Sequence, residues 1–224
     1  MRNFNSVFSH VINYITVIPY LYRYENQNHI DTFFENGDLF ISSFHNYKKY
    51  EDNELGDTDE GKSMNFAKSN HDLTLGNYVS TGMNEYSFCT STIFDESLLK
   101  TFSRNSVFRI KEPLNFILEI TRSLQRVHQV MHGHCLYLDQ RILTKNVSGV
   151  DMDSLKSEEG GISFEKLIQV SNYVQGMDAY FLKQKKYQHQ SEYRILWQTD
   201  RDVKNGIVIN CPEAIKYCEK VEIK

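Results

Sequence analysis

A carboxylate and an amide stand two residues apart, just before an apolar segment near the end of the chain. Gln190 and Glu192 precede Tyr193–Trp197, whose aromatic and β-branched residues favour a strand. Side chains alternate along a strand, so one face carries Tyr193, Ile195 and Trp197 and the other carries Glu192, Arg194 and Leu196. We expect the first face to join the core. A carboxylate at the mouth of such a strand is either a catalytic group or a solvated strand end.

Two earlier segments carry polar groups that could act together with this carboxylate. Arg23 lies in a short predicted strand, residues 21–24. A second predicted strand, residues 86–92, ends in three hydroxyls, those of Thr90, Ser91 and Thr92. Each feature also has an ordinary interpretation: an ion pair at a strand end for Arg23, strand filling for the hydroxyls, and a surface charge ladder for Glu192 with Arg194.

Two further clusters contain residue types that bind metals. Residues 51–61 hold six acidic and no basic side chains, which is typical of a solvated loop. An EF-hand starting at Asp52 would place Asp57 where glycine is needed. A metal-dependent hydrolase remains an alternative, and its candidate ligands are Asp52, Asp57, Asp59 and Glu60, or His128, His132, His134 and Cys135.

The pattern of apolar residues, glycines and prolines predicts elements of both kinds. Helices are expected at 4–15, 28–36, 95–102, 114–131, 164–174 and just after Pro212. Strands are expected at 21–24, 38–42, 86–92, 107–110, 136–138, 193–197, 206–209 and 221–223. The polar segments 63–84 and 146–161 are expected to be a surface segment and a loop. Because strands and helices are interspersed, we predict one α+β domain over 1–224 with six to eight strands.

The composition excludes several classes of protein. The chain has 224 residues and a net charge of −4, unlike a basic nucleic-acid coat or a disordered acidic tail. Four cysteines without a CxxC pair indicate neither a disulfide framework nor a zinc ribbon. No run of about 18 apolar residues occurs, so no membrane association is expected and the predicted location is the cytoplasm.

The order of the polar motifs resembles the ADP-ribosyltransferase superfamily, in the Arg-Ser-Glu form with a Q-x-E motif. Arg23 matches the first-strand arginine, the segment Phe88–Thr92 is similar to the aromatic-x-Ser-Thr-Ser strand, and Gln190-Ser191-Glu192 looks like Q-x-E. Thr90 departs from the pattern, since it stands where the first serine would be. The chain also resembles a broad bacterial family of uncharacterised proteins through its Tyr-Arg-Tyr strand, the loop Gly56–Gly61 and the segment Phe181–Ile195.

This resemblance implies a fold, a cofactor and roles for particular residues. The implied fold is a mixed or antiparallel split sheet with flanking helices, and NAD is the implied substrate. Glu192 would bond the ribose 2-hydroxyl and face the positive charge that develops at the oxocarbenium-like transition state. The remaining roles follow the family: Thr90 orients Glu192, Gln190 positions the acceptor, Arg23 holds the pyrophosphate, Tyr22, Ser91 and Thr92 bind the cofactor, and Tyr22 or Tyr187 stacks on nicotinamide.

The acceptor is expected to be an intracellular macromolecule. Lys183, Lys185, Lys186 and Arg194 could form a basic patch beside Glu192 that suits RNA or DNA, or a solvated basic turn that offsets the acidic residues 51–60. A modifier of host components would fit a toxin of a toxin–antitoxin or antiphage system, with a neutralising antitoxin protein as partner. The alternative from another class is a non-enzymatic interaction module on the same fold.

Overall fold

The computed structural model describes residues 18–48, 54, 57–68, 74–146, 155, 161, 163–168 and 177–223. Its helices are α2 (Gln27–Asn36), α3 (Ser97–Thr101), α4 (Pro113–Ser123), and the 3₁₀ turns η1 (Phe44–Lys48), η3 (Asp178–Phe181), η4 (Lys185–Gln190) and η5 (Pro212–Tyr217). Its strands are β1 (Leu21–Glu25), β2 (Asp38–Ser43), β3 (Lys62–Lys68), β4 (Thr74–Ser80), β5 (Glu85–Ser91), β6 (Ser106–Ile110), β7 (Val127–His134), β8 (Leu136–Leu138), β9 (Ile142–Asn146), β10 (Leu182–Gln184), β11 (Glu192–Thr199), β12 (Ile207–Asn210) and β13 (Cys218–Lys220).

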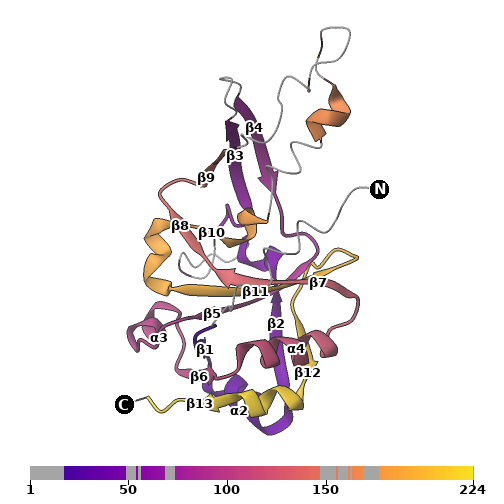
Figure 1. Ribbon diagram of the computed structural model, residues 1–224. Helices are drawn as coiled ribbons and strands as arrows, with labels where there is room; N and C mark the ends of the chain where they lie inside the picture. The colour runs from indigo at the N-terminus through magenta and orange to yellow at the C-terminus, as the bar shows by residue number, and fades with distance from the viewer. Residues whose placement is uncertain are drawn as a thin grey trace.

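An eight-stranded antiparallel sheet forms the centre of the molecule (Figure 1). Its main path runs β12-β2-β5-β1-β6-β13, and β11 pairs with β5 on one side and with β7 on the other. Strands far apart in sequence therefore become neighbours: β1, β5 and β11 lie side by side. The predicted α+β class, the single domain and an antiparallel sheet of about eight strands are confirmed for the described residues. These residues form thirteen strands in all, more than the six to eight predicted.

The sheet splits along one edge of β5. At the start of β5, Ser42 and Ser43 of β2 pair with it, whereas at its end Tyr22 of β1 pairs with Ser91. Between these two contacts no other strand among the described residues pairs with this edge, and the carbonyl of Cys89 accepts a hydrogen bond from Arg23 Nη1 at 2.7 Å. The split therefore creates a gap in the sheet into which the side chain of Arg23 projects.

The main core lies on one face of this sheet, beneath α2, α4 and η5. It buries the three side chains predicted to share a face, Tyr193, Ile195 and Trp197. Trp197 is fully buried, and its indole N–H donates to Thr121 Oγ1 at 2.8 Å, which satisfies the one polar atom that it brings inside. This face anchors β11, so the opposite face of the strand is fixed in space as well.

The helix predicted at 28–36 is confirmed as α2, together with its stop. Gly37 follows it with φ +82°, a left-handed conformation that glycine adopts without a steric penalty, and its N–H donates to Phe33 O at 2.8 Å. The backbone of Pro212 lies directly against Gly37, so a side chain would not fit there. The short helix predicted after Pro212 is confirmed as η5.

Three predictions of secondary structure are wrong. The helix predicted over 114–131 ends at Ser123, because Leu124 is extended and Arg126 has φ +60°, and the chain then forms β7 against β11. The segment predicted to be a polar surface stretch, 63–84, contains β3 and β4. The closing strand is β13 rather than 221–223. The helix predicted at 4–15 lies outside the described residues.

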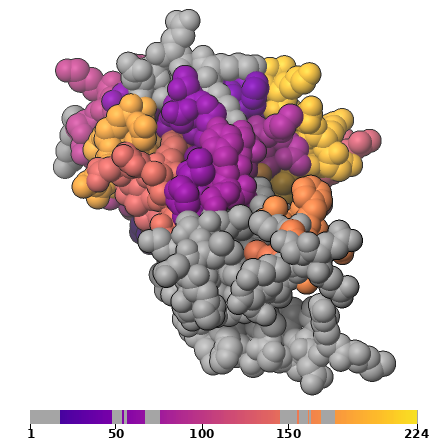
Figure 2. Space-filling view, turned by 90° about the horizontal axis from the view of Figure 1, so that it is seen from above, coloured from indigo at the N-terminus to yellow at the C-terminus, as the bar shows by residue number. Residues whose placement is uncertain are grey.

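A second, three-stranded sheet rises above the central one. Its order is β4-β3-β9, and β3 pairs with β9 in parallel. Seen from above, violet and magenta atoms of the β3–β4 region lie at the surface (Figure 2). A two-stranded parallel pair, β8 with β10, packs against η4, and Tyr137 and Lys183 of this pair bond Glu192 at the start of β11. No helix among the described residues is long and apolar enough to cross a membrane.

Candidate functional site

The turn that carries Gln190 and Glu192 is held against the end of β5. Ser191 has φ +43°, and its N–H donates to Gln188 O, so the chain reverses sharply between η4 and β11. The N–H and hydroxyl of Thr92 both donate to the Ser191 carbonyl, at 2.9 and 3.3 Å. Glu192 then pairs across the sheet with Ser91. Thr92 therefore acts on the site as a backbone anchor for this turn.

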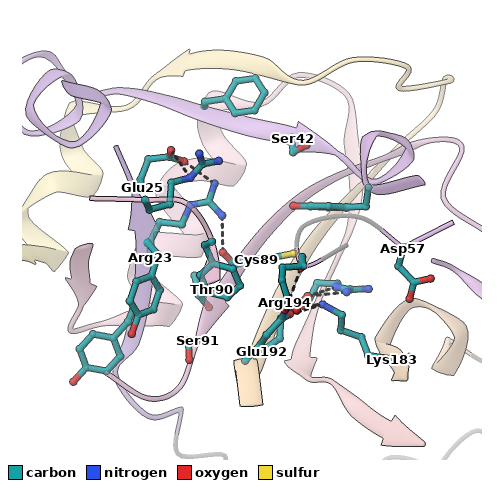
Figure 3. A pocket seen from close by; sticks show the side chains of 18 of the residues that line it. Arg23, Glu25, Ser42, Asp57, Cys89, Thr90, Ser91, Lys183, Glu192 and Arg194 are labelled. Atoms are coloured by element: carbon teal, nitrogen blue, oxygen red, sulfur yellow. Dashed lines mark hydrogen bonds and ion pairs between the residues drawn. The ribbon is translucent and has the colours of Figure 1, made fainter. Parts of the chain in front are cut away.

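Glu192 is buried in a cluster of charged groups (Figure 3). Lys183 Nζ lies 2.6 Å from Oε2, and Arg194 bonds Oε1 through Nε and Nη2, each at 2.7 Å. Arg194 also bonds the buried carboxylate of Glu60 at 2.8 Å. The side chains of Arg194 and Glu60 are only 1% and 3% exposed. The surface charge ladder considered for Glu192 and Arg194 is thus wrong, because two carboxylates and two cations form a balanced internal cluster.

The charge cluster fixes the protonation state of Glu192. Burial opposes ionisation, but the fields of Arg194 and Lys183 outweigh it and hold the pKa of Glu192 far below its usual value. The same attraction raises the pKa of Lys183 against the effect of its own burial. Glu192 is therefore a permanent anion at neutral pH. It can accept hydrogen bonds and stabilise positive charge, but it has no proton to give.

Gln190 is also buried, between Lys183 and Glu54. Its Oε1 accepts from Lys183 Nζ at 2.8 Å. Its Nε2 donates to the carbonyl and to the carboxylate of Glu54, at 3.0 and 3.1 Å. Gln190 and Glu54 both line the cavity described below, so the amide nitrogen of Gln190 lies on the side of that cavity.

Arg23 projects from β1 into the split of the sheet. In addition to Cys89 O, it bonds Glu25 at 3.1 Å, and its guanidinium lies 4.7 Å from the centre of the Phe88 ring. Although burial lowers the pKa of Arg23, the nearby Glu25 raises it, so the guanidinium keeps its charge. The strand-end ion pair considered for Arg23 is present, but the side chain also lines a cavity.

The hydroxyls of β5 differ in their positions relative to Glu192. Thr90 Oγ1 donates to Tyr193 O at 2.8 Å and so bonds the backbone of β11 instead of the carboxylate. The prediction that Thr90 orients Glu192 is therefore wrong. By strand alternation, the residues of β5 on the Glu192 side are Cys89 and Ser91, which pair with Arg194 and Glu192. Ser91 is buried, and its Oγ accepts from Ile93 N–H at 3.2 Å.

Sequence reasoning missed two residues of the site, Cys89 and Tyr47, and placed a third, Lys183, in a surface patch. Burial and the neighbouring Glu192 raise the pKa of the Cys89 thiol to about 11, so it stays protonated at neutral pH. Burial likewise raises the pKa of Tyr47, whose phenol lies close to Cys89 and Arg23. Cys89 lies inside the Phe88–Thr92 motif and could have been found there, whereas nothing in the sequence marks Tyr47.

The two tyrosines considered for stacking occupy different environments. Tyr22 is partly exposed, lines the cavity and packs against Phe94 with ring centres 5.8 Å apart. Tyr187 is buried and does not line the cavity; the ammonium groups of Lys183 and Lys186 lie 4.9 and 4.7 Å from its ring centre. Tyr22 therefore remains a candidate for stacking, and Tyr187 packs beneath the site.

These groups surround a cavity of about 210 Å³. A second cavity of about 260 Å³ adjoins it and is lined mainly by apolar side chains from α2, β2, β5 and β6. The two cavities share the side chains Arg23, Glu25, His29 and Phe40. Arg23 and Glu192, which are 169 positions apart in the sequence, thus line the same cavity.

The predicted basic patch is mostly internal. Lys183 and Arg194 are buried in the charge cluster, and only Lys185 and Lys186 are exposed on η4. Lys185 lies 3.9 Å from Asp139. The patch of four cations beside Glu192 is therefore wrong as a surface for a polyanion.

The residues considered for metal binding are dispersed. Each acidic group pairs with a different cation, Asp57 with Arg141, Asp59 with Lys62 and Glu60 with Arg194, while Asp52 lies outside the described residues. The histidines lie on β7 instead of a helix end, and His132 Nδ1 contacts Tyr193 Oη at 2.8 Å. No group of three metal-ligating side chains gathers in the part of the chain that the structure describes.

The site combines a permanent carboxylate, an arginine and an amide donor around one cavity. Such a set binds and stabilises charge without a metal ligand set of its own among the described residues. In comparisons with known proteins, the chain matches no family model, no curated protein and no solved structure.

Proposed function

We propose that the protein transfers ADP-ribose from NAD to an intracellular macromolecule, a protein or a nucleic acid. The observation that carries the proposal is the adjacency of three strands. The strand of Arg23, the strand of Thr90-Ser91-Thr92 and the strand of Glu192 are neighbours in one sheet, although they are far apart in sequence. If the three motifs bind one NAD molecule, the strands that carry them must be neighbours.

The state of Glu192 suits the chemistry of this reaction. Cleavage breaks the bond between ribose C1′ and the nicotinamide nitrogen, the electron pair leaves with nicotinamide, and positive charge develops on the ribose. A carboxylate that is ionised at every working pH faces this charge without having to lose a proton first. An acceptor nucleophile then bonds C1′ and releases its proton to solvent.

The carboxylate also keeps room for a ribose hydroxyl. A carboxylate accepts about four hydrogen bonds. Among the described residues, Lys183 supplies one and Arg194 two, which leaves about one acceptor position for a ribose hydroxyl.

The paired cavities suit a dinucleotide. Ligand sites commonly measure about 300–1,000 Å³, more than either cavity alone. Arg23 lies between them, where its guanidinium would bond the pyrophosphate in the charge-assisted geometry that arginine favours. The nicotinamide ribose would occupy the cavity of Glu192, and the apolar cavity would take the adenine ring.

Labelled NAD tests the proposal. Purified protein is incubated with NAD labelled in its adenylate half and with protein or nucleic-acid fractions of a lysate. We expect label in one fraction, lost in Glu192→Gln and retained in Glu219→Gln, which removes an acidic side chain on the edge strand β13. No transfer to either fraction, or transfer that persists in Glu192→Gln, would refute it.

The second candidate is a non-enzymatic binding module, and the closed charge cluster favours it. All four charges are internally paired, as in a purely structural cluster, and Thr90 bonds backbone. A toxin or antiphage effector with an antitoxin partner belongs only to the first candidate. A ligand that binds the folded state raises the melting temperature, so NAD raises it if the first candidate holds and leaves it unchanged if the second does.

A further inference from the structure

Lys183 connects the two residues of the Q-x-E motif. Its ammonium group lies 2.6 Å from Glu192 Oε2 and 2.8 Å from Gln190 Oε1, and it is almost fully buried. We propose that Lys183 is a positioning residue that fixes the carboxylate of Glu192 and turns the amide of Gln190 so that its N–H donors face the acceptor. This inference rests on the proposed function, whose acceptor it helps to define.

The place of Lys183 is determined by the strand that carries it. β10 pairs in parallel with β8, with Lys183 opposite Tyr137, whose hydroxyl accepts from the Glu192 N–H at 2.7 Å. The neighbouring Leu182 is fully buried, and its carbonyl accepts from Arg141. The same two strands therefore hold both the backbone and the carboxylate of Glu192.

The ammonium group of Lys183 makes two hydrogen bonds and lies close to an aromatic ring. A lysine ammonium has three N–H donors and no acceptor. Two are directed at Gln190 and Glu192, and the ring of Tyr187 lies 4.9 Å from Nζ. Two hydrogen bonds and the ring hold this ammonium group in place, in contrast to the usual mobile surface lysine.

The orientation of the Gln190 amide follows from this contact. Because lysine cannot accept a hydrogen bond, the amide oxygen must face Lys183 and the amide nitrogen must face away. In the structure that nitrogen donates to the carbonyl and carboxylate oxygens of Glu54 at the cavity. A substrate group that takes the place of Glu54 must likewise accept hydrogen bonds, as a carbonyl, carboxylate or ring nitrogen does.

The first test measures the ionisation of Glu192 and does not depend on activity. The titratable and charged groups that face Glu192 are Lys183, Arg194, Glu60, Cys89, Cys135, Tyr47 and Tyr137. The ¹³C resonance of its carboxyl carbon, assigned with Glu192→Gln, is followed as the pH falls. We expect a rise in the pKa by about one pH unit or more in Lys183→Met, because one of two adjacent cations is gone.

Lys186→Met is the matched control for this titration. Lys186 Nζ lies 4.7 Å from the same Tyr187 ring, but the residue is exposed on η4. Its loss should leave the pKa of Glu192 unchanged. An unchanged pKa in Lys183→Met overturns the inference, even if the protein transfers ADP-ribose. If Lys183→Met does not fold, Lys183→Gln decides in the same way, since it removes the charge and keeps a donor.

The second test distinguishes the role of the Gln190 amide from that of the Glu192 carboxylate. Gln190→Glu offers an oxygen to Lys183 but has no donor to turn outward. With the Gln190 donor lost, we expect label transfer to the acceptor to fall at least tenfold while nicotinamide release from NAD continues. Equal loss of both, or full transfer by Gln190→Glu, overturns the assignment of the amide. If wild-type protein neither transfers nor releases nicotinamide, the proposed function fails, and the titration alone decides the coupling of Lys183 to Glu192.

Discussion

At the scale of single residues, the site depends on charges that balance one another inside the protein. Glu192 and Glu60 would be costly to bury alone, and Arg194 bonds both. Its guanidinium also packs 5.2 Å from the centre of the Phe44 ring and donates to Tyr180 O. Arg194 is therefore the residue whose removal leaves the most charge without a partner.

Replacing Arg194 should destabilise the fold strongly. Arg194→Leu leaves two buried carboxylates short of a cation, and we expect a loss of about 3–5 kcal/mol in the free energy of unfolding, measured in urea. The exposed pair Lys62–Asp59 gives the control, since Lys62→Leu should cost less than about 1 kcal/mol. Adding Glu60→Gln to Arg194→Leu should recover part of the loss. If Lys62→Leu and Arg194→Leu lowered the free energy of unfolding equally, Arg194 would not be the centre of a buried charge cluster.

The cluster also predicts how stability depends on pH. Because the folded pKa of Glu192 is lowered from 4.5, its contribution is complete above about pH 4.5 and is lost as the pH falls toward the folded value. Lys183 has its pKa raised from 10.5, so its contribution is complete below about pH 10.5 and is lost as the pH rises beyond that.

Urea unfolding between pH 7 and pH 3 measures the predicted loss of stability at acid pH. In Glu192→Gln the fall in unfolding free energy below pH 4.5 should be shallower than in wild type, by up to about 1.4 kcal/mol per pH unit for one proton. Parallel curves for the two proteins would mean that Glu192 is not held ionised by its neighbours.

At the scale of elements, tight turns place the strands that carry the site. Gly37 ends α2 and lets the chain return as β2, one of the two strands that border the split in the sheet. Gly37→Ala would put a methyl group 2.5 Å from Pro212 N and keep a non-glycine residue at φ +82°. We expect a loss of about 1–3 kcal/mol in unfolding free energy from the backbone conformation alone.

Gly133→Ala is the control for that substitution. Its added carbon would meet only the Phe181 ring, at 3.8 and 3.9 Å, which is ordinary contact. Thermal or urea unfolding should show a change within about 1 kcal/mol. A mild effect of Gly37→Ala would indicate that α2 and η5 move apart easily.

Elements with strong local signals could be predicted, and those decided by distant pairing could not. The end of α2 at Gly37 and the buried face of β11 can be read from the sequence, because a glycine stop and the alternation of side chains along a strand depend only on neighbouring residues. Residues 127–131 continue the helical spacing of the preceding segment but form part of β7, since pairing with β11 outweighs local propensity. The strands β3 and β4 were missed for the same reason, as their polar side chains carry little pattern.

The main residues of the site could be predicted from the sequence, but their contacts could not. Glu192, Gln190 and Arg23 line one cavity, as their motifs suggest. The role of Thr90 was not predictable, because a register one residue out of step moves a hydroxyl to the other face of a strand. The buried state of Lys183 likewise depends on the pairing of β10 with β8, which its own sequence does not show.

At the scale of the whole molecule, the split sheet is the feature that makes a site. β5 pairs with β11 along one edge, while β2 and β1 diverge along the other, and the opening is lined by Arg23, Cys89 and Glu192. Chemistry-bearing side chains from the start, middle and end of the chain meet there. The proposed reaction is thus a property of the sheet topology as much as of any one motif.

Nicotinamide release from NAD is the most direct test of this account. Purified wild-type protein should release nicotinamide even without an acceptor, with water as the nucleophile. Glu192→Gln should release it at least about 100-fold more slowly, the usual cost of losing one group that stabilises a transition-state charge. Circular dichroism should confirm that the variant is folded. No release by the wild type, or an equal rate in folded Glu192→Gln, would contradict the account.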